Sequence, residues 1–307
     1  MNKLNLLVTI YSNLHNYKGI PFWVLTPFRR IVRTISKHQL PKYLRNCKKT
    51  TPKDKSEVIV SFTSFPARIE NVWQVVECML RQTYQPKKIF LWLSKEQFPS
   101  KEELPKSLLE CENDIFEIRF VDGDIRSHKK YYYVSKEYPD SLILLIDDDI
   151  YYPTDMVEKM IKEHYKYPKA IISRYGSIIK YNKDGSIAPR KKGWNEITSA
   201  TSNKNYFFGS GGGTLIIPNS LYRDLTNKDL FLNLTPTADD IWLNSMARLN
   251  NIPIRKIKFG NILPIKQKRN NPTLASVNLG NSEDDIQIQK VINHYKNTIN
   301  VILFQKQ

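Results

Sequence analysis

Short apolar runs alternate with amphipathic segments between residues 57 and 180. Runs rich in β-branched and aromatic residues predict buried strands, at residues 57–65, 87–94, 115–123, 141–153 and 170–179. Apolar positions three or four apart predict helices, at residues 69–82, 101–113, 128–139 and 154–168, the last capped by Thr154. This alternation predicts parallel βαβ units and therefore an α/β fold with a mostly parallel central sheet.

The pattern changes on both sides of this region. Residues 181–215 read as loop-rich, residues 238–249 predict a helix, and the polar tail after about residue 260 shows less regularity. Residues 1–55 mix tryptophan, phenylalanine, leucine and isoleucine with arginines, which predicts a helical arm. We therefore expect a basic amphipathic N-terminal arm at residues 1–55 and one α/β domain at residues 56–307.

The charge of the chain is concentrated in that arm. The formal net charge is +17, and residues 1–55 contribute +11 of it, with twelve Lys or Arg and one Asp. Such a segment either lies in an anionic membrane interface or packs on the domain with its basic face in solvent, and we favour packing. We expect no nucleic-acid partner, because no nucleic-acid-binding motif accompanies the charge.

Cysteines and apolar segments bear on the compartment. The three cysteines, Cys47, Cys78 and Cys111, are widely spaced and suit a reducing environment rather than a disulfide scaffold. Neither a secretory leader nor an apolar run of about 18 residues is recognisable. We therefore expect a cytoplasmic protein, with peripheral attachment to the inner membrane face as the open alternative.

The strongest chemical signal is Asp147-Asp148-Asp149, which directly follows the apolar run LILLI. Three carboxylates at the end of a buried strand repel one another and lose hydration, so a cation is expected to compensate them. Mn²⁺ or Mg²⁺ suits hard carboxylate oxygens and keeps coordination positions for phosphates. The alternative is a solvated acidic turn.

Five motifs in order give a family resemblance. They are VSFTSFPARI, LRQTYQPKKIFLWLS, YPDSLILLIDDDIYYP, GSGGGTLIIPNSL and ADDIW. Over about residues 56–300 this chain resembles bacterial glycosyltransferases related to family 2. The resemblance implies a GT-A fold, which is a nucleotide-sugar-binding α/β domain. It also implies transfer of a sugar, from a UDP-sugar as the expected donor, to a hydroxyl of a glycan or lipid-linked acceptor in cell-surface polysaccharide biosynthesis.

The resemblance implies donor-binding roles. Asp149 would be the chief metal ligand and Asp147 a metal or ribose contact. The other implied donor contacts are Ser64, Arg68, Asp122, Asp124, Lys130, Asp148, Gly211 and Gly212. A lysine such as Lys130 suits a pyrophosphate, and glycines allow close backbone approach to a ligand. For each of these, a purely structural role is the competing interpretation: a solvated charge or a tight turn.

The resemblance also implies a catalytic pair. Asp240 would be the general base that deprotonates the acceptor hydroxyl, with Asp239 in support. The alternative is that both residues cap the start of the predicted helix, where its dipole favours carboxylates. Two further expectations are an aromatic acceptor platform of Trp194, Tyr206, Phe207 and Phe208, with core packing as its alternative, and closure of the basic segment 263–271 over the donor phosphates.

Two other function classes are open at this stage. One is a Mg²⁺-dependent phosphotransferase or phosphohydrolase that uses the aspartates, although no phosphate-binding P-loop sequence is present. The other is a non-enzymatic nucleic-acid-binding protein, which the overall charge supports and the missing motifs oppose.

Overall fold

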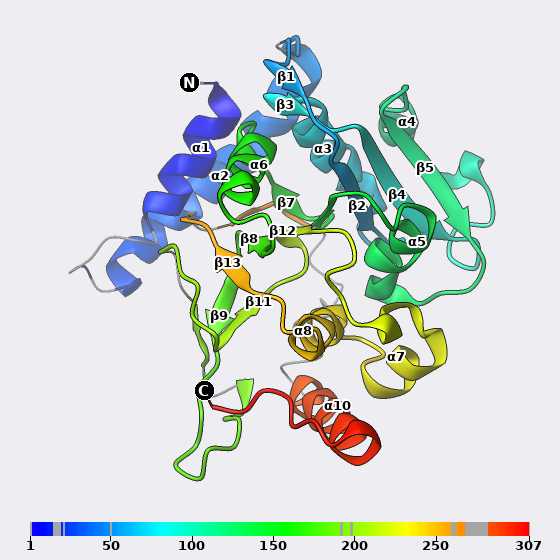
Figure 1. The fold of residues 1–307 in the computed structure, drawn as a ribbon. Coiled ribbons are helices and arrows are strands. Elements are labelled where there is room, and N and C mark those ends of the chain that lie inside the picture. Colours follow the sequence, from blue (N-terminus) through cyan, green and yellow to red (C-terminus); the bar gives the residue numbers. More distant parts are fainter. Residues whose placement is uncertain are drawn as a thin grey trace.

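The computed structural model describes residues 2–14, 20, 22–49, 51–190, 193–196, 199–258, 262–267 and 282–306. Its centre is a seven-stranded sheet with strand order β13-β8-β12-β6-β2-β4-β5 (Figure 1). The strands are β2 (Ile59–Thr63), β4 (Lys88–Ser94), β5 (Phe116–Val121), β6 (Ile143–Ile146), β8 (Ile171–Ser173), β12 (Gly212–Ile216) and β13 (Ile254–Lys256). The sequence predicted five of these seven strands in outline.

Six of the seven strands run in the same direction. β2 pairs in parallel with β4 and β6, and β4 with β5, while β12 alone is antiparallel to both of its neighbours. β13 is parallel to β8. The architecture confirms the expected α/β fold class, with a mostly parallel central sheet and a helical N-terminal arm.

Helices cover both faces of the sheet because successive strand residues point to opposite sides. Val60 and Phe62 of β2 belong to one buried cluster, while Ile59 belongs to the other. The helices of the domain are α3 (Ile69–Leu80), α4 (Lys106–Leu109), α5 (Lys129–Glu137), α6 (Met156–Lys166), α7 (Lys228–Leu234), α8 (Asp239–Leu249) and α10 (Glu283–Ile299), the last of which packs against α7 and α8. Three small sheets lie outside the central one. Two of them are strand pairs: β1 (Asp54–Lys55) with β3 (Tyr84–Gln85), and β7 (Ile150–Tyr151) with β14 (Leu263–Pro264). In the third, β10 (Asn195–Glu196) and β11 (Tyr206–Phe208) flank β9 (Gly176–Ile178).

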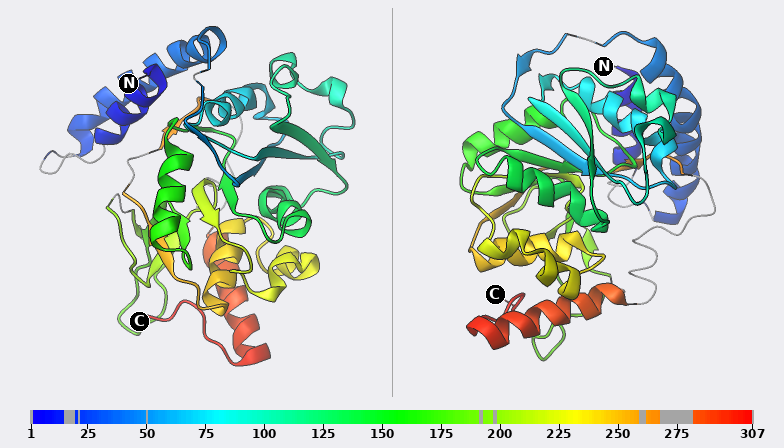
Figure 2. Two further views of the ribbon diagram at one scale, coloured as in Figure 1. Left: turned by 45° about the horizontal axis from the view of Figure 1, so that its top comes forward. Right: turned by 90° about the vertical axis from the view of Figure 1, so that its right-hand side faces the viewer.

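The N-terminal arm forms two helices, α1 (Lys3–Asn13) and α2 (Phe22–Asn46), which lie side by side at one end of the molecule (Figure 2). Leu4, Leu7 and Tyr11 of α1 are buried in the same cluster as Val60 and Phe62. The Arg81 guanidinium donates to the carbonyl oxygens of Leu44 and Cys47, at 2.7 and 2.8 Å. Both carbonyls lie at the C-terminal end of α2. The arm therefore packs on the domain, as favoured from the sequence. Among the described helices, none is both long and apolar enough to span a bilayer.

Three local predictions were wrong. The strand expected over residues 170–179 divides at Arg174 and Tyr175 into β8 and β9, which belong to different sheets. Thr154 does not cap α6. The cap residue is Asp155, and the Thr154 hydroxyl accepts instead from the Asn5 side chain of α1, at 2.9 Å. The helix expected over residues 101–113 reduces to a 3₁₀ turn and the four-residue α4, because Pro105 interrupts it.

The longest elements in the regions expected to be irregular are β12 and α10. The glycine run continues into β12, where Gly213 has φ +106° and the register of pairing with β6 shifts beside it. That bulge conceals the strand pattern, since glycines carry no hydrophobic signal. The C-terminal tail holds the 17-residue helix α10, whose buried Ile288, Val291 and Tyr295 follow helical spacing. This helical spacing is visible in the sequence, so the prediction of an irregular tail was wrong for residues 283–299.

Candidate active site

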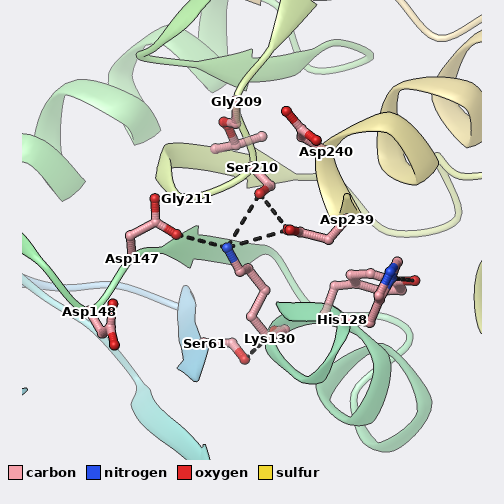
Figure 3. A network of polar contacts seen from close by, with 12 residues as sticks. Ser61, His128, Lys130, Asp147, Asp148, Gly209, Ser210, Gly211, Asp239 and Asp240 are labelled. Carbon is pink, nitrogen blue, oxygen red and sulfur yellow. Dashed lines mark hydrogen bonds and ion pairs between the residues drawn. The ribbon is translucent and has the colours of Figure 1, made fainter. Parts of the chain in front are cut away.

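Polar residues from three elements meet at the carboxyl ends of β2 and β6 (Figure 3). Asp147, Asp148 and Asp149 follow β6, Lys130 comes from the first turn of α5, and Asp239 begins α8. Ligands of open α/β sheets bind at this edge. The fold therefore brings Lys130, Asp147 and Asp239 together at that edge, although they are far apart in the sequence.

Lys130 is the centre of this cluster. Its ammonium nitrogen lies 2.8 Å from Asp147 Oδ1, 3.3 Å from Asp239 Oδ2 and 3.4 Å from Ser210 Oγ. The Ser210 hydroxyl also donates to Asp239 Oδ2, at 2.5 Å. Burial lowers the pKa of Lys130, but Asp147 and Asp239 outweigh burial and raise it. The lysine is thus permanently charged and joins residues that are 17 and 109 positions away in the chain.

Hydrogen bonds with β2 and with Thr235 fix the start of α5. The Ser61 hydroxyl of β2 donates to the Lys130 carbonyl oxygen at 2.5 Å, and Trp92 Nε1 donates to Ser61 Oγ at 2.9 Å. His128 Nε2 lies 2.6 Å from the Thr235 carbonyl oxygen, which only accepts, so this nitrogen carries the proton. Burial lowers the pKa of His128 to about 4, so the ring is neutral at pH 7. His128 is therefore a structural residue that joins the start of α5 to Thr235.

We expect Lys130→Met to destabilise the fold by about 3 kcal/mol at pH 7, because it leaves two acids around the site without their cation. Urea unfolding measures this loss. Lys136→Met is the matched control, since Lys136 lies on the same helix and is exposed, and it should change the free energy of unfolding by less than about 0.5 kcal/mol. Equal small effects of both variants would contradict the central role of Lys130.

The three consecutive aspartates alternate in exposure. The Asp148 side chain is 6% exposed, whereas those of Asp147 and Asp149 are 37% and 27% exposed. Asp148 accepts hydrogen bonds from Ser64 Oγ and Arg68 Nη1, both at 2.6 Å. Arg68 Nη1 also lies 3.0 Å from Asp149 Oδ2. Ser64 and Arg68 thus organise the aspartates from the loop that follows β2.

Electrostatics differ along the same triplet. Burial raises the pKa of Asp148, although Arg68 and Ser64 oppose it. Burial, with repulsion from Asp148 and Asp147, outweighs Arg68 and raises the pKa of Asp149 to about 7. The cations of the protein therefore do not fully compensate the negative charge of the Asp149 carboxylate.

The described residues include no cluster of three or more His, Cys, Asp or Glu arranged to hold a metal ion. Arg68 and Lys130 supply positive charge beside the triplet instead. Even so, Asp147 and Asp149 present two partly exposed carboxylates on either side of buried Asp148. Mg²⁺ is commonly held by one or two carboxylates together with substrate phosphates. The donor set therefore fits a cation whose coordination shell is completed by a phosphorylated ligand.

The glycine run approaches the triplet closely. A Cβ atom on Gly211 would lie 1.7 Å from Asp147 Oδ1, so only glycine allows the start of β12 to pass Asp147. Tyr152 adds to this contact by donating from its hydroxyl to the Gly211 carbonyl oxygen at 2.6 Å. Gly212 packs against the Tyr175 side chain, where a Cβ atom would come within 2.5 Å. These contacts make the glycines part of the wall around Asp147, and their expected role towards a donor stays a prediction.

The two carboxylates at the start of α8 have different partners. Asp239 points to Lys130 and Ser210, and these outweigh the effect of burial and lower its pKa. Asp240 lies 3.3 Å from Arg190 Nη1, and burial raises its pKa despite that arginine. The helix begins after Ala238, which makes no side-chain capping bond. The pair thus combines one inward, structural carboxylate with one whose proton affinity is increased.

Sequence reasoning missed Arg190 and its partner Asp284. Arg190 Nη1 lies 2.8 Å from Asp284 Oδ2 at the start of α10. The guanidinium also lies over the rings of Trp194 and Phe207, with 5.3 and 5.2 Å to their centroids. A loop arginine in the segment APRKKGW carries no periodic signal, so nothing in the sequence placed it at Asp240.

The remaining expected residues lie away from this cluster or in the core. Asp122 pairs with Lys95 at an exposed position, and Asp124 pairs with Lys129 and accepts from Gln97. The aromatic acceptor platform was wrong in that all four rings are buried in the core: Trp194, Tyr206, Phe207 and Phe208. Of the basic segment, residues 263–267 are described and dock beside α3 through Asn71, while residues 268–271 lie outside the described part of the chain.

The solved structures that resemble this chain do so at low sequence identity. No protein-family model and no curated protein sequence matches the chain, so the family 2 resemblance rests on the five motifs alone. Among solved structures, 4-diphosphocytidyl-2C-methyl-D-erythritol synthase from Anaerococcus prevotii is 15% identical, with a TM-score of 0.41 over 71% of this chain and 93% of that one.

A second similar solved structure is a UDP-glucose pyrophosphorylase. Without ligand it is 12% identical, with a TM-score of 0.40 over 80% of this chain and 99% of that one. A UDP-glucose pyrophosphorylase in complex with UDP-glucose is also 12% identical, with a TM-score of 0.37 over 80% of this chain and 100% of that one. Likenesses of this size are too distant to assign a substrate or a reaction to this chain.

Proposed function

We propose that this protein is a metal-dependent glycosyltransferase that moves a sugar from a nucleotide-sugar donor, a UDP-sugar by preference, to a hydroxyl of a glycan or lipid-linked acceptor. The observation that carries the proposal is the meeting of Asp147–Asp149 with Asp239 and Asp240 at the carboxyl edge of the sheet, around Lys130. The five-motif resemblance supplies the reaction class. We place the reaction in cell-surface polysaccharide biosynthesis, on the cytoplasmic side of the membrane.

Donor binding falls to the partly exposed carboxylates of this edge. Asp147 and Asp149 would hold Mg²⁺ or Mn²⁺ together with the donor phosphates, and the cation would neutralise charge on the departing nucleoside diphosphate. Arg68 holds Asp148 and Asp149 in place through its guanidinium. Lys130 fixes Asp147 relative to Asp239. Arg68, Lys130 and Ser64 therefore act as positioning residues for the carboxylates.

Proton removal from the acceptor falls to Asp240. Its raised pKa makes it a stronger base than an ordinary carboxylate. In a transfer with inversion, the acceptor oxygen bonds to the anomeric carbon as the bond to the nucleoside diphosphate breaks. Asp240 then takes the hydroxyl proton. Arg190 holds this carboxylate from the other side and is itself held by Asp284.

Thermal stability with a panel of nucleotide sugars, each with and without Mn²⁺, tests the proposal. A ligand that binds only the folded state raises the melting temperature. At a free concentration 100 times Kd we expect the ligand to add about 2.7 kcal/mol of stability, for one UDP-sugar and only with metal. Product analysis then separates transfer from nucleotidyl chemistry. Release of UDP supports the proposal, whereas formation of UTP from the UDP-sugar and added pyrophosphate contradicts it.

A further inference from the structure

The N-terminal helix α2 carries an exposed apolar face. Phe28, Ile31 and Ile35 are 54%, 55% and 36% exposed, and their spacing of three and four places them on one side of the helix. Trp23, near the helix start, is 76% exposed. We call Phe28, Ile31 and Ile35 the α2 apolar face; Trp23 precedes it on a neighbouring side of the helix. A separate stripe of the helix, with Val32 and Leu40, is buried against the domain. The packing of the arm therefore leaves this face uncovered.

The helix that carries the α2 apolar face is strongly basic. Arg30, Lys37 and Lys42 are exposed on the same helix, and residues 1–55 contribute +11 to the charge of the chain. An exposed apolar stripe on a strongly basic helix is the pattern of a segment that lies in an anionic lipid interface. A second copy of this chain is a poor partner for the face, because each copy has a net charge of +17 and would repel the other.

We propose that the α2 apolar face binds the surface of an anionic lipid bilayer. The aromatic and aliphatic side chains enter the boundary between headgroups and acyl chains, and the flanking cations contact lipid phosphates. One helix of this kind gives reversible attachment, since its apolar face buries only three large apolar side chains. Attachment therefore depends on both anionic lipid and low salt.

A cavity separates the C-terminal half of α2 from α3. Lys37, Lys42 and Arg45 of α2 line a cavity of about 820 Å³ with Asn71 and Gln74 of α3. That helix begins directly after Arg68, which holds the aspartates of the candidate active site. Membrane binding itself does not depend on the proposed function. If that function holds, the same contact keeps the protein at the surface that carries lipid-linked acceptors.

Trp23 provides a direct test in the unmodified chain. The other four tryptophans, which also lie in the described ranges, are at most 8% exposed: Trp73, Trp92, Trp194 and Trp242. We expect vesicles of equal phosphatidylcholine and phosphatidylglycerol to shift the fluorescence to the blue, and brominated acyl chains to quench it. Pure phosphatidylcholine vesicles should do so at least about tenfold more weakly. Fluorescence that is unchanged by the anionic vesicles would overturn the proposal.

Sedimentation with the same vesicles tests the face itself. The triple variant Phe28→Ser, Ile31→Ser, Ile35→Ser should bind at least about tenfold more weakly. The matched control, Ile286→Ser, Val301→Ser, Ile302→Ser, removes exposed apolar residues near the C-terminus and should bind as the unmodified chain does. Equal binding by both triple variants would overturn the proposal. So would a dimer of the unmodified chain that the α2 substitutions dissociate, because the face would then be a protein interface.

Discussion

Asp149→Asn should lower sugar-transfer turnover by at least about a thousandfold and, at the same time, stabilise the metal-free protein. The loss of activity follows from the role proposed for this carboxylate beside the donor phosphates. The gain in stability follows from its environment. Burial and the neighbouring aspartates raise the pKa of Asp149 to about 7, so folding opposes its ionised form. Asparagine resembles the neutral acid and removes that opposition.

The pH dependence gives this prediction a definite sign. The folded pKa of Asp149 is raised from 3.8 to about 7. Above pH 7 the ionised side chain therefore costs stability, and this cost disappears as the pH falls towards 4. The advantage of Asp149→Asn should be on the order of a few kcal/mol at pH 8 and vanish near pH 4. Urea unfolding in a chelator at both pH values measures it.

Asp140→Asn is the control for this experiment. Asp140 is an exposed aspartate in a turn, so its replacement should change neither turnover nor the pH dependence of stability. Two results would count against the assignment of Asp149. One is near-full metal-dependent turnover in Asp149→Asn. The other is a variant that is less stable than the unmodified chain at pH 8.

Asp240→Asn should lower kcat by about 10²- to 10⁴-fold while donor binding, measured by the thermal shift with nucleotide sugar and metal, persists. An amide cannot take the acceptor proton, yet it keeps the size of the side chain and a hydrogen-bond acceptor for Arg190. The fold should therefore survive the change. A loss of kcat with unchanged donor affinity is the signature of a group that acts in the transition state.

Asp239→Asn separates the two roles of the pair. Asp239 accepts from Ser210 and faces Lys130, so its replacement should reduce the free energy of unfolding, whereas Asp240→Asn should not. Loss of the fold in Asp240→Asn would show that this carboxylate serves the helix start. Equal turnover in Asp240→Asn and the unmodified chain would remove the general base from the proposal.

Much of the sheet was readable from the sequence, because strand and helix periodicity depend on near neighbours. The apolar runs around Phe62, Phe90 and Leu144 are local patterns, and the polar residues that end those strands are local too. Parallel strands bring their carboxyl ends to one edge, so the meeting of Ser64 with the aspartates followed from the topology. The arm was likewise recognisable, as a basic amphipathic segment.

Contacts between distant segments were not readable. β12 reads as a glycine loop, and only its pairing with β6 and β8 makes it a strand. The sequence does not show whether the rings of Tyr206 and Phe208 are exposed or buried. Their burial depends on packing against residues far away in the chain. Arg190 reaches Asp240 and Asp284 across 50 and 94 residues. A propensity acts over a few residues, whereas these pairings depend on the whole fold.

The sequence by itself determined the α/β class, the order of the first strands, the basic arm and the identity of the acidic groups at the sheet edge. Tertiary structure alone decided which cation faces which acid: Lys130 lies between Asp147 and Asp239, and Arg68 lies against Asp148 and Asp149. It also decided that Asp148 is buried while its neighbours stay accessible. The physical reason is that charge pairing and burial depend on distances in space, which residue spacing along the chain does not specify.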